Sequence, residues 1–342
     1  MSAAAPKAAI IGVGSIAGSH YAGYEAAGVE VVALCDVNPL ALSARGEQWG
    51  VGRWHTNINE LFAEGGFDMV SIAAPTSVHH PATMAAAAAG VHVLVEKPIA
   101  LDIGLADEMI EACSAAGVVL MVNHQLRSSG AVRKARELIR AGAIGRITNV
   151  RLRQAHDWGG RTSVAPGFSV RTTSGGGTLL DNGCHLADLA LHLGGAVESI
   201  YARLTNTKFD IEVEDTAHAS LSYANGALGL IETAWTATGW EDAFWVYGTE
   251  GALESTNRYG PPTLRHLHRS SPGGNWDETD VTEYRFTGHG AHVRHVMAFV
   301  AAVKGEGPVI CTGEDGREAM RLILAAYASA DLGAPVRPTE VT

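Results

Sequence analysis

The sequence is poor in charged residues and in cysteine, and it lacks any long uninterrupted apolar run. Of its 342 residues, 18% are charged and 46% are hydrophobic, a balance typical of a globular chain long enough for two domains. The longest apolar stretch, Met84 to Val95, is interrupted by Gly90 and His92, which excludes a membrane span. The first residues lack the basic start and separate apolar core of a secretory signal, which predicts a cytoplasmic protein without membrane contact.

The cysteines and the net charge exclude further classes of protein. The four cysteines are widely scattered and form no Cys-x-x-Cys pair, so we expect buried thiols and no bound metal: Cys35, Cys113, Cys184 and Cys311. Most of the 15 histidines are predicted to be structural or solvated. The net charge of −11 disfavours nucleic acid as a partner, since such binding depends on Lys and Arg neutralising phosphates.

The first third of the chain alternates between short β-branched runs and alanine-rich helical stretches. This alternation is typical of βαβ units on a parallel sheet. The predicted strands are Ala8-Gly12, Val29-Cys35, Met69-Ala73, His92-Glu96 and Val118-Val122. The predicted helices lie around Gly18-Ala27, Pro39-Gln48, Pro81-Ala89 and Gly104-Ala116.

After Asn123 the pattern changes, and strands predominate. One helix, Ala131-Arg140, precedes the expected strands Ile147-Arg153, His218-Tyr223, Ala227-Trp235, Phe244-Tyr247 and Thr279-Phe286, with a hairpin signal at Asn225-Gly226. The stretch from Tyr259 to Asp277 is predicted to be a long exposed loop, and Val293-Val303 and Glu314-Ala330 are predicted helices.

We therefore predict an α/β fold with two domains. Residues 1–123 would form a Rossmann dinucleotide-binding domain. Residues 124–342 would form an α+β domain with a large, mostly antiparallel open sheet that binds substrate and mediates oligomerisation. The final helices are expected to pack on that sheet or back on the first domain.

A glycine-rich turn follows the first predicted strand, with the pattern Gly-x-Gly-x-x-Ala. Gly12 permits a tight turn, Gly14 lets a pyrophosphate approach the backbone, and the helix N-terminus after Ser15 and Ile16 faces the anion. Asp36 ends the second strand, 22 residues after Gly14, where a carboxylate can bind ribose hydroxyls and would repel a 2′-phosphate. The turn and Asp36 therefore predict NAD rather than NADP. Arg45 is near in sequence, but we expect it on a solvated helix face, where it would not bind a 2′-phosphate.

Two further strand ends meet at the same edge of the predicted sheet. Pro75 and Thr76 follow the Met69-Ala73 strand and could line the nicotinamide side, while His79 either lines the pocket or packs locally. Glu96, Lys97 and Pro98 close the His92-Glu96 strand, and ligands of open α/β sheets bind beyond such carboxyl ends. An isolated Lys there is usually solvated, so Lys97 gains significance only from the motifs around it.

The C-terminal region contains a run of three glycines followed by Asp181 and His185. If Asp181 begins a helix, His185 lies on the same face, where a carboxylate can orient the imidazole and raise its basicity. Such a pair can act as a general base on a hydroxyl, although taken alone it is more often a helix cap and a core histidine.

In order and separation, these motifs resemble the glucose-fructose oxidoreductase / inositol dehydrogenase (Gfo/Idh/MocA) family. The resemblance covers nearly the whole chain, including Glu214-Asp215-Thr216-Ala217 and Tyr247-Gly248-Thr249-Glu250-Gly251. It implies an NAD-dependent oxidoreductase, and a homodimer or homotetramer assembled through the C-terminal sheet. It also implies that Lys97 contacts the cofactor ribose and the substrate hydroxyl, and that Asp181 and His185 are the catalytic pair with His185 as base.

The implied substrate is a small polyhydroxylated molecule, a sugar, sugar derivative or cyclitol whose hydroxyl is oxidised to a ketone or lactone, or the reverse. The family's Gly-Phe-Asn-x-Arg is only partly kept, at Arg127, and its Trp-Arg is replaced by Phe168 to Arg171. The other predicted substrate contacts have donors or an aromatic face that suits such a ring: His156, Trp158, Arg161 and Arg171. Two alternatives stay open: glycoside cleavage with transient redox and no net cofactor turnover, and a non-catalytic dinucleotide-binding sensor.

Overall fold

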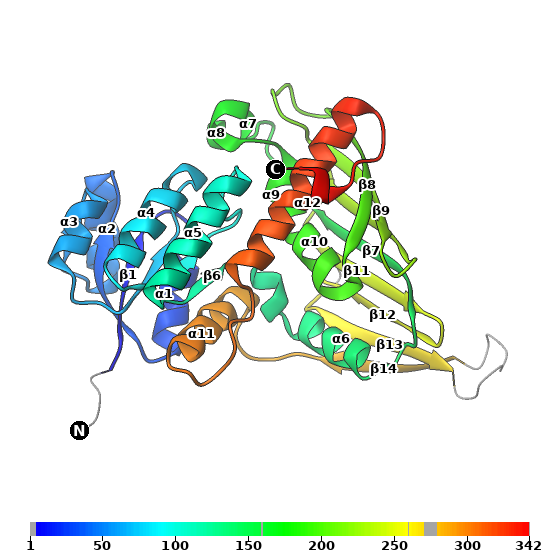
Figure 1. The fold of residues 1–342 in the computed structure, drawn as a ribbon, viewed down its shortest axis with the longest axis horizontal. Helices are drawn as coiled ribbons and strands as arrows, with labels where there is room; N and C mark the ends of the chain where they lie inside the picture. Colours follow the sequence, from blue (N-terminus) through cyan, green and yellow to red (C-terminus); the bar gives the residue numbers. More distant parts are fainter. Residues whose placement is uncertain (1–4, 159, 259, 270–278, 342) are drawn as a thin grey trace. The chain divides into compact units, whose positions relative to one another are not determined.

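The protein is represented by a computed structural model that describes residues 5–158, 160–258, 260–269 and 279–341 (Figure 1). The chain divides into two compact units. The first unit comprises the chain up to Ser129 together with His289–Arg317, and the second comprises Gly130–Gly288 and Glu318 onward. Among the described residues, no helix combines the length and apolar character needed to cross a membrane.

The first unit is built on a six-stranded sheet whose pairings are all parallel, in the order β3-β2-β1-β4-β5-β6. Its strands are β1 (Lys7–Ile11), β2 (Glu30–Cys35), β3 (Trp54–His55), β4 (Met69–Ile72), β5 (His92–Val95) and β6 (Leu120–Val122). All four β4 residues are buried, as expected for a strand covered by helices on both faces. The strand order reverses between β1 and β4, where doubly wound folds bind their ligands.

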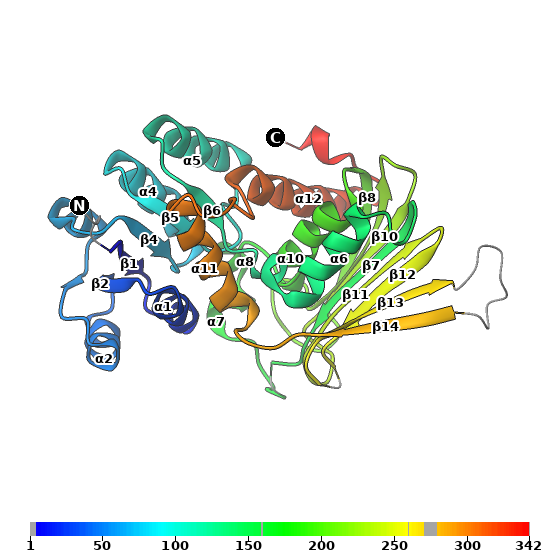
Figure 2. The same ribbon diagram turned by 90° about the horizontal axis from the view of Figure 1, so that it is seen from below.

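Helices cover both faces of this sheet (Figure 2). On one face α4 (Thr76–Ala88) packs beside α5 (Ile103–Ala116), and on the other α1 (Ala17–Ala26) packs beside α11 (Ala291–Val303). The remaining helices of the first unit are α2 (Pro39–Trp49), α3 (Ile58–Glu64) and the short η1 (Gln125–Ser128). Val296, Phe299 and Val300 of α11 lie in the same hydrophobic core as the strands.

The second unit is built on an eight-stranded sheet in the order β14-β13-β12-β11-β7-β10-β9-β8. Its strands are β7 (Ile147–Ala155), β8 (Val197–Thr205), β9 (Thr216–Tyr223), β10 (Leu228–Ala234), β11 (Glu241–Gly248), β12 (Gly251–Thr256), β13 (Thr263–Arg269) and β14 (Thr279–Arg285). β10 pairs with β7 in parallel and every other pairing is antiparallel.

One face of this sheet carries the helices of the second unit (Figure 2). They include α6 (Gly130–Arg140), the short α7 (Pro166–Ser169) and α8 (Arg171–Ser174), and α9 (Thr178–Asp181) followed by α10 (Gly183–Leu189) and η2 (Ala190–Gly194). α12 (Gly313–Leu332) begins in the first unit and continues into the second, where Ser329 Oγ accepts a hydrogen bond from the Ala202 N–H of β8, and η4 (Pro338–Glu340) follows near the C-terminus. In the described part of the chain the opposite face carries no helix.

The predicted fold class is confirmed, with specific errors in the elements. The sequence patterns missed β3, α3, β8, β12 and β13, and placed the start of α4 at Pro81 instead of Thr76. The long loop predicted over Tyr259 to Asp277 is wrong at Thr263–Arg269, which form β13 between β12 and β14. The rest of that stretch lies partly outside the described residues. The proposed domain boundary at residues 123 and 124 stays a prediction.

Two glycines of α1 provide a test of how it packs on α11. A Cβ at Gly23 would clash with the Val296 side chain, whereas one at Gly18 would have no described neighbour within 4 Å. Gly23→Ala should therefore lower the free energy of unfolding by about 1–3 kcal/mol through overpacking. Gly18→Ala should raise it by about 0.5–1 kcal/mol, because alanine favours a helix. Urea unfolding of both variants measures the difference, and equal stabilisation by both would contradict the packing described.

Candidate active site

The glycine-rich turn after β1 meets the end of β4 at the point where the strand order reverses. Gly12 has a φ of 85°, which disfavours any other residue, and a Cβ there would lie 2.5 Å from Ala73 O. Its N–H donates to Cys35 O over 2.7 Å. The turn is therefore held tightly between β2 and β4.

Asp36 stabilises this turn directly. Its Oδ2 accepts the Val13 N–H at 2.9 Å and its Oδ1 accepts the Asn38 N–H at 2.9 Å. The Arg45 Nε donates to Val13 O at 3.3 Å, and its guanidinium lies 5.2 Å from the Trp49 ring. Arg45 is half-buried and also bonds to Gln48 on the exposed face of its helix, so it lies partly in solvent, as predicted, while its Nε reaches back to the glycine-rich turn.

The residues around this turn fit a dinucleotide. A Cβ added at Gly14 would have no described atom within 4 Å, so a ligand can approach its backbone, and Ser15 is exposed. In the described chain the N-terminus of α1, which follows Ile16, has no side-chain cap, nor has that of α4, which follows Pro75 and begins at Thr76. Uncapped helix N-termini offer N–H groups to an anion such as a pyrophosphate.

Lys97 follows β5 and is half-buried, and the residue before it is part of a buried hydrogen-bond network. Glu96 Oε1 accepts from His20 Nε2 at 3.0 Å and from Asn123 Nδ2, and its Oε2 accepts the Lys97 N–H at 3.1 Å. His20 Nδ1 lies 2.9 Å from Ser71 Oγ, which in turn lies 2.9 Å from the Tyr24 hydroxyl. Glu96 therefore positions the Lys97 backbone instead of facing a ligand.

The environment of Glu96 keeps it ionised. Burial raises the pKa of this carboxyl, but the hydrogen bond and charge of His20, the Asn123 amide and the charge of Lys97 outweigh burial and lower the pKa to about 2. The result is a fixed negative charge directly behind Lys97.

His79 holds the other side of the same loop. Its Nδ1 lies 2.9 Å from Pro98 O and its Nε2 lies 3.0 Å from Ala74 O. Burial lowers the pKa of His79 against the pull of these carbonyl oxygens. Of the two roles predicted for His79, the structure favours local packing over a pocket position, and the peptide bond between Lys97 and Pro98 that it supports is cis.

The structure gives Arg127 a role within the first unit. Its Nη1 donates to Ile310 O at 3.0 Å and to Asp315 Oδ2 at 2.9 Å, and the side chain is buried. These bonds attach η1 to the start of α12. Arg127 thus has a structural role, and its predicted contact with substrate stays a prediction.

In the second unit, the run of three glycines is explained by close packing. A Cβ at Gly177 would clash with Glu214 O, and one at Gly176 would clash with the Tyr327 hydroxyl. Glu214 Oε1 accepts from the Gly177 N–H at 3.1 Å, from the Leu179 N–H at 3.0 Å and from the Tyr327 hydroxyl at 2.8 Å. Glu214 thereby fixes the start of α9.

Asp181 and His185 occupy consecutive short helices rather than a single one. Asp181 ends α9, Asn182 separates the two helices, and His185 lies in the first turn of α10, where it is buried. The expectation that Asp181 begins a helix is thus wrong, because Glu214 starts the helical turn at Thr178. The two side chains remain within one helix-break-helix segment of the second unit.

Of the predicted substrate contacts, His156 lies nearest to this segment. The charge of Asp181 and the Asn182 side chain both act to raise the pKa of His156. Burial, the largest influence, nevertheless lowers that pKa and favours a neutral imidazole, whose Nδ1 accepts the Trp158 N–H at 3.2 Å. Trp158 has a φ of 56°, a conformation that non-glycine residues rarely adopt outside functional or tight segments.

The two remaining arginines lie on the surface of the second unit. Arg161 and Arg171 are exposed, and the Arg171 N–H and guanidinium bond to Glu212. Sequence reasoning missed His20, Asn123 and Tyr327, which support the predicted residues, and Trp240, whose ring stacks on His156. Among the supporting residues, only Glu214 stands in a local pattern that could have identified it, the Glu-Asp-Thr-Ala motif.

Two family models match most of the chain. Residues 7–124 match the oxidoreductase family with an NAD-binding Rossmann fold, and residues 132–254 match the GFO/IDH/MocA C-terminal domain. The chain belongs to the Gfo/Idh/MocA oxidoreductase family. The first unit is therefore the NAD-binding domain of an oxidoreductase, which confirms the predicted family and cofactor.

Several members of the Gfo/Idh/MocA family are similar over nearly the full length. The 1,5-anhydro-D-fructose reductase of Ensifer adhaerens is 32% identical over 95% of this chain and 96% of the relative. The myo-inositol 2-dehydrogenase of Thermotoga maritima is 27% identical over 97% of this chain and 98% of the relative. The structure of a levoglucosan dehydrogenase in complex with NADH superposes with a TM-score of 0.88 at 23% identity. The match covers 97% of this chain and 98% of the other, and it supports the fold alone.

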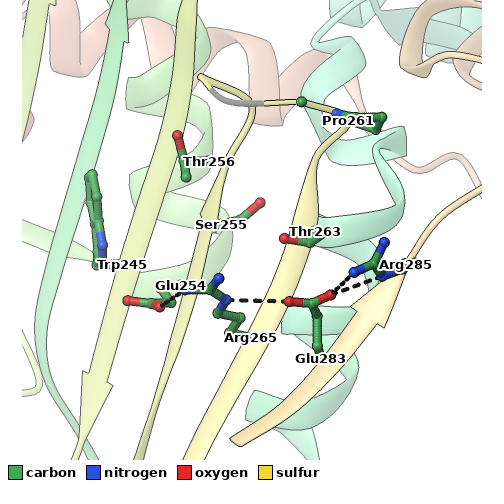
Figure 3. Close-up of a pocket in the computed structure, with 10 residues that line it drawn as sticks. Trp245, Glu254, Ser255, Thr256, Pro261, Thr263, Arg265, Glu283 and Arg285 are labelled. Carbon is green, nitrogen blue, oxygen red and sulfur yellow. Dashed lines mark hydrogen bonds and ion pairs between the residues drawn. The ribbon is translucent and has the colours of Figure 1, made fainter.

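A pocket of the second unit is lined by none of the predicted site residues (Figure 3). It is lined by polar side chains of β11 to β14, among them Trp245, Glu254, Arg265 and Glu283. Arg265 pairs with Glu254 and with Glu283, each at 3.4 Å. Such exposed ion pairs contribute little to stability.

The buried Glu96 makes a prediction about acid stability. Because its pKa is about 2 instead of the ordinary 4.5, its contribution is complete above pH 4.5 and is lost as the pH falls toward 2. Between pH 6 and pH 3 the wild type should lose about 2 kcal/mol more stability than Glu96→Gln. Urea unfolding across this range measures the slopes.

Glu30→Gln, at the exposed start of β2, is the matched control and should keep the wild-type slope. If Glu96→Gln and Glu30→Gln show the same dependence on pH, Glu96 does not have the environment described.

Proposed function

We propose that the protein is an NAD-dependent dehydrogenase that oxidises a hydroxyl of a sugar, sugar derivative or cyclitol to a ketone or lactone, or runs the reverse reduction. The observation that supports it most is the position of Lys97 at the carboxyl edge of the NAD-binding sheet, where its N–H bonds to Glu96 and the next residue, Pro98, bonds to His79. A lysine that merely extends into solvent would not require these bonds to its backbone and to the next residue. The relatives named as a reductase of an anhydrosugar and as an inositol dehydrogenase point to the same substrate class.

The chain's own residues have distinct roles in this proposal. His185 takes the hydroxyl proton as general base, and Asp181 orients and stabilises the imidazolium that forms. The Lys97 ammonium donates a hydrogen bond to the same oxygen and stabilises negative charge as the C=O bond forms. NAD, when bound, supplies the acceptor for the hydride that leaves the carbinol carbon.

The residues proposed to hold NAD are those at the ends of four strands, β1, β2, β4 and β5. The turn of Gly12, Gly14, Ser15 and Ile16 receives the pyrophosphate, and Asp36 the adenosine ribose. Pro75, Thr76 and Lys97 line the nicotinamide side, with His79 and Glu96 supporting them. His156, Trp158, Arg161 and Arg171 are retained as proposed substrate contacts. A cytoplasmic location and a homodimer or homotetramer formed through the C-terminal sheet belong to the same proposal.

A panel of sugars and cyclitols with NAD, followed by NADH absorbance, tests this function. We expect turnover of at least one compound, and a loss of kcat/KM of roughly 100- to 10,000-fold in Lys97→Met and in His185→Asn. His218→Asn, at an exposed histidine of β9, is the control and should retain activity. Bound NADH without turnover across the panel would count against simple dehydrogenation, and a glycoside consumed without net NADH would favour the cleavage reaction.

A further inference from the structure

Trp240 is an exposed indole whose position is fixed on one face. Its ring stacks on that of His156, with centroids 4.7 Å apart and planes 1° from parallel. The residue is nevertheless 54% exposed, so the face opposite His156 is open to solvent. Isolated exposed aromatics are common, and exposure alone is no sign of function.

The indole is also held at its edge. Trp240 Nε1 donates to Asp242 Oδ2 at 2.8 Å. Asn257 Nδ2 donates to the same oxygen at 3.1 Å, and the Gln154 amide donates to Asp242 Oδ1 at 2.5 Å. The Asp242 N–H donates in turn to Asn257 Oδ1 at 2.7 Å. A ring fixed by stacking and by this network loses little further freedom when a ligand packs on its open face.

Trp240 is one edge of a larger aromatic cluster, which we define as His156, Trp158, Phe168, Trp235 and Trp240. Trp158 contacts His156, Trp235 and Phe168 edge to face, with centroids 5.5, 5.4 and 5.2 Å apart. Trp235 is fully buried beneath the cluster, whereas Phe168 and Trp240 are exposed. Segments that are distant in the sequence therefore build one surface with open aromatic faces.

The aromatic cluster adjoins the segment that holds Asp181 and His185. α9 and α10 pack on β7 and β10, and His156 directly follows β7, where its N–H donates to Ala234 O at the end of β10. A ring packed on the open face of Trp240 would lie roughly 8–9 Å from the centre of His156, one van der Waals contact of about 4 Å beyond the indole. Trp240 is thus placed to bind a group beyond the one that reacts.

The charges around Trp240 limit the chemistry of its ligand. Asp242 bonds the indole edge, and Asp157 and Asp181 both act on His156. These carboxylates disfavour a phosphate or a carboxylate on the ligand. A neutral ring with an apolar face, either the C–H face of a second sugar or an aryl group, fits an open indole.

We propose that Trp240 and the aromatic cluster form a subsite for the second ring of a neutral glycoside, so that the substrate is a glycoside and not a free monosaccharide. This inference rests on the proposed function, since it assigns a second ring to the molecule whose hydroxyl is oxidised. Trp240 would determine affinity and specificity without taking part in proton or hydride transfer.

Calorimetric titration of the NAD-loaded protein tests the subsite directly. The probes are glucose, methyl β-glucoside, phenyl β-glucoside and cellobiose. We expect phenyl β-glucoside or cellobiose to bind more tightly than methyl β-glucoside, and Trp240→Ala to weaken the two-ring probes by roughly 3- to 10-fold while leaving the one-ring probes unchanged. Trp240→Phe should retain most of the preference, and the Kd values of phenyl β-glucoside and cellobiose distinguish an aryl group from a second sugar.

Trp245→Ala, at a half-buried tryptophan of β11, is the matched control and should not change the preference. Equal weakening of one-ring and two-ring probes by Trp240→Ala, or no weakening of any, would overturn the subsite. A change in oligomeric state with unchanged glycoside affinity would also overturn it and assign Trp240 to an interface. Turnover of sugars without a two-ring preference refutes the subsite alone, whereas failure of the dehydrogenase proposal appears as absence of turnover by the wild type.

Discussion

The buried carboxylate of Glu96 is the group on which the NAD-binding unit depends most. It joins α1 through His20, β6 through Asn123 and the Lys97 backbone in one network at the end of β5. A buried charge is tolerated only when it is hydrogen-bonded on several sides, and each of these bonds also fixes an element next to the cofactor edge. The same group therefore stabilises the fold and positions the lysine that we propose to be catalytic.

Much of the fold could be predicted, because the first unit is made of local units that repeat a clear pattern. The second unit was harder, since its strands are specified by partners far away in the sequence. In β13, the buried positions are occupied by Leu264 and His266, and a histidine on the inner face hides the alternation of apolar residues. Two prolines just before it strengthened the mistaken prediction of a loop.

The candidate site shows the same division. Gly12, Asp36, Lys97, Asp181 and His185 could be selected because each stands in a short motif at a strand end or helix start. Their supports could not, because His20, Asn123 and Trp240 reach the site only through the folded chain and have no motif of their own. Arg127 shows the opposite case. It matches a family motif, but in the folded chain its side chain bonds to Asp315. The aromatic cluster is likewise a product of tertiary structure.

The proposed function requires that a hydride pass from a substrate carbon to NAD. An accepted substrate that carries deuterium on the carbinol carbon, followed by mass spectrometry of the cofactor, tests this transfer. The NADH formed should contain the deuterium, in an amount equal to that of the oxidised product. Consumption of the substrate with the deuterium retained in the product or released to water, and none in NADH, would contradict it.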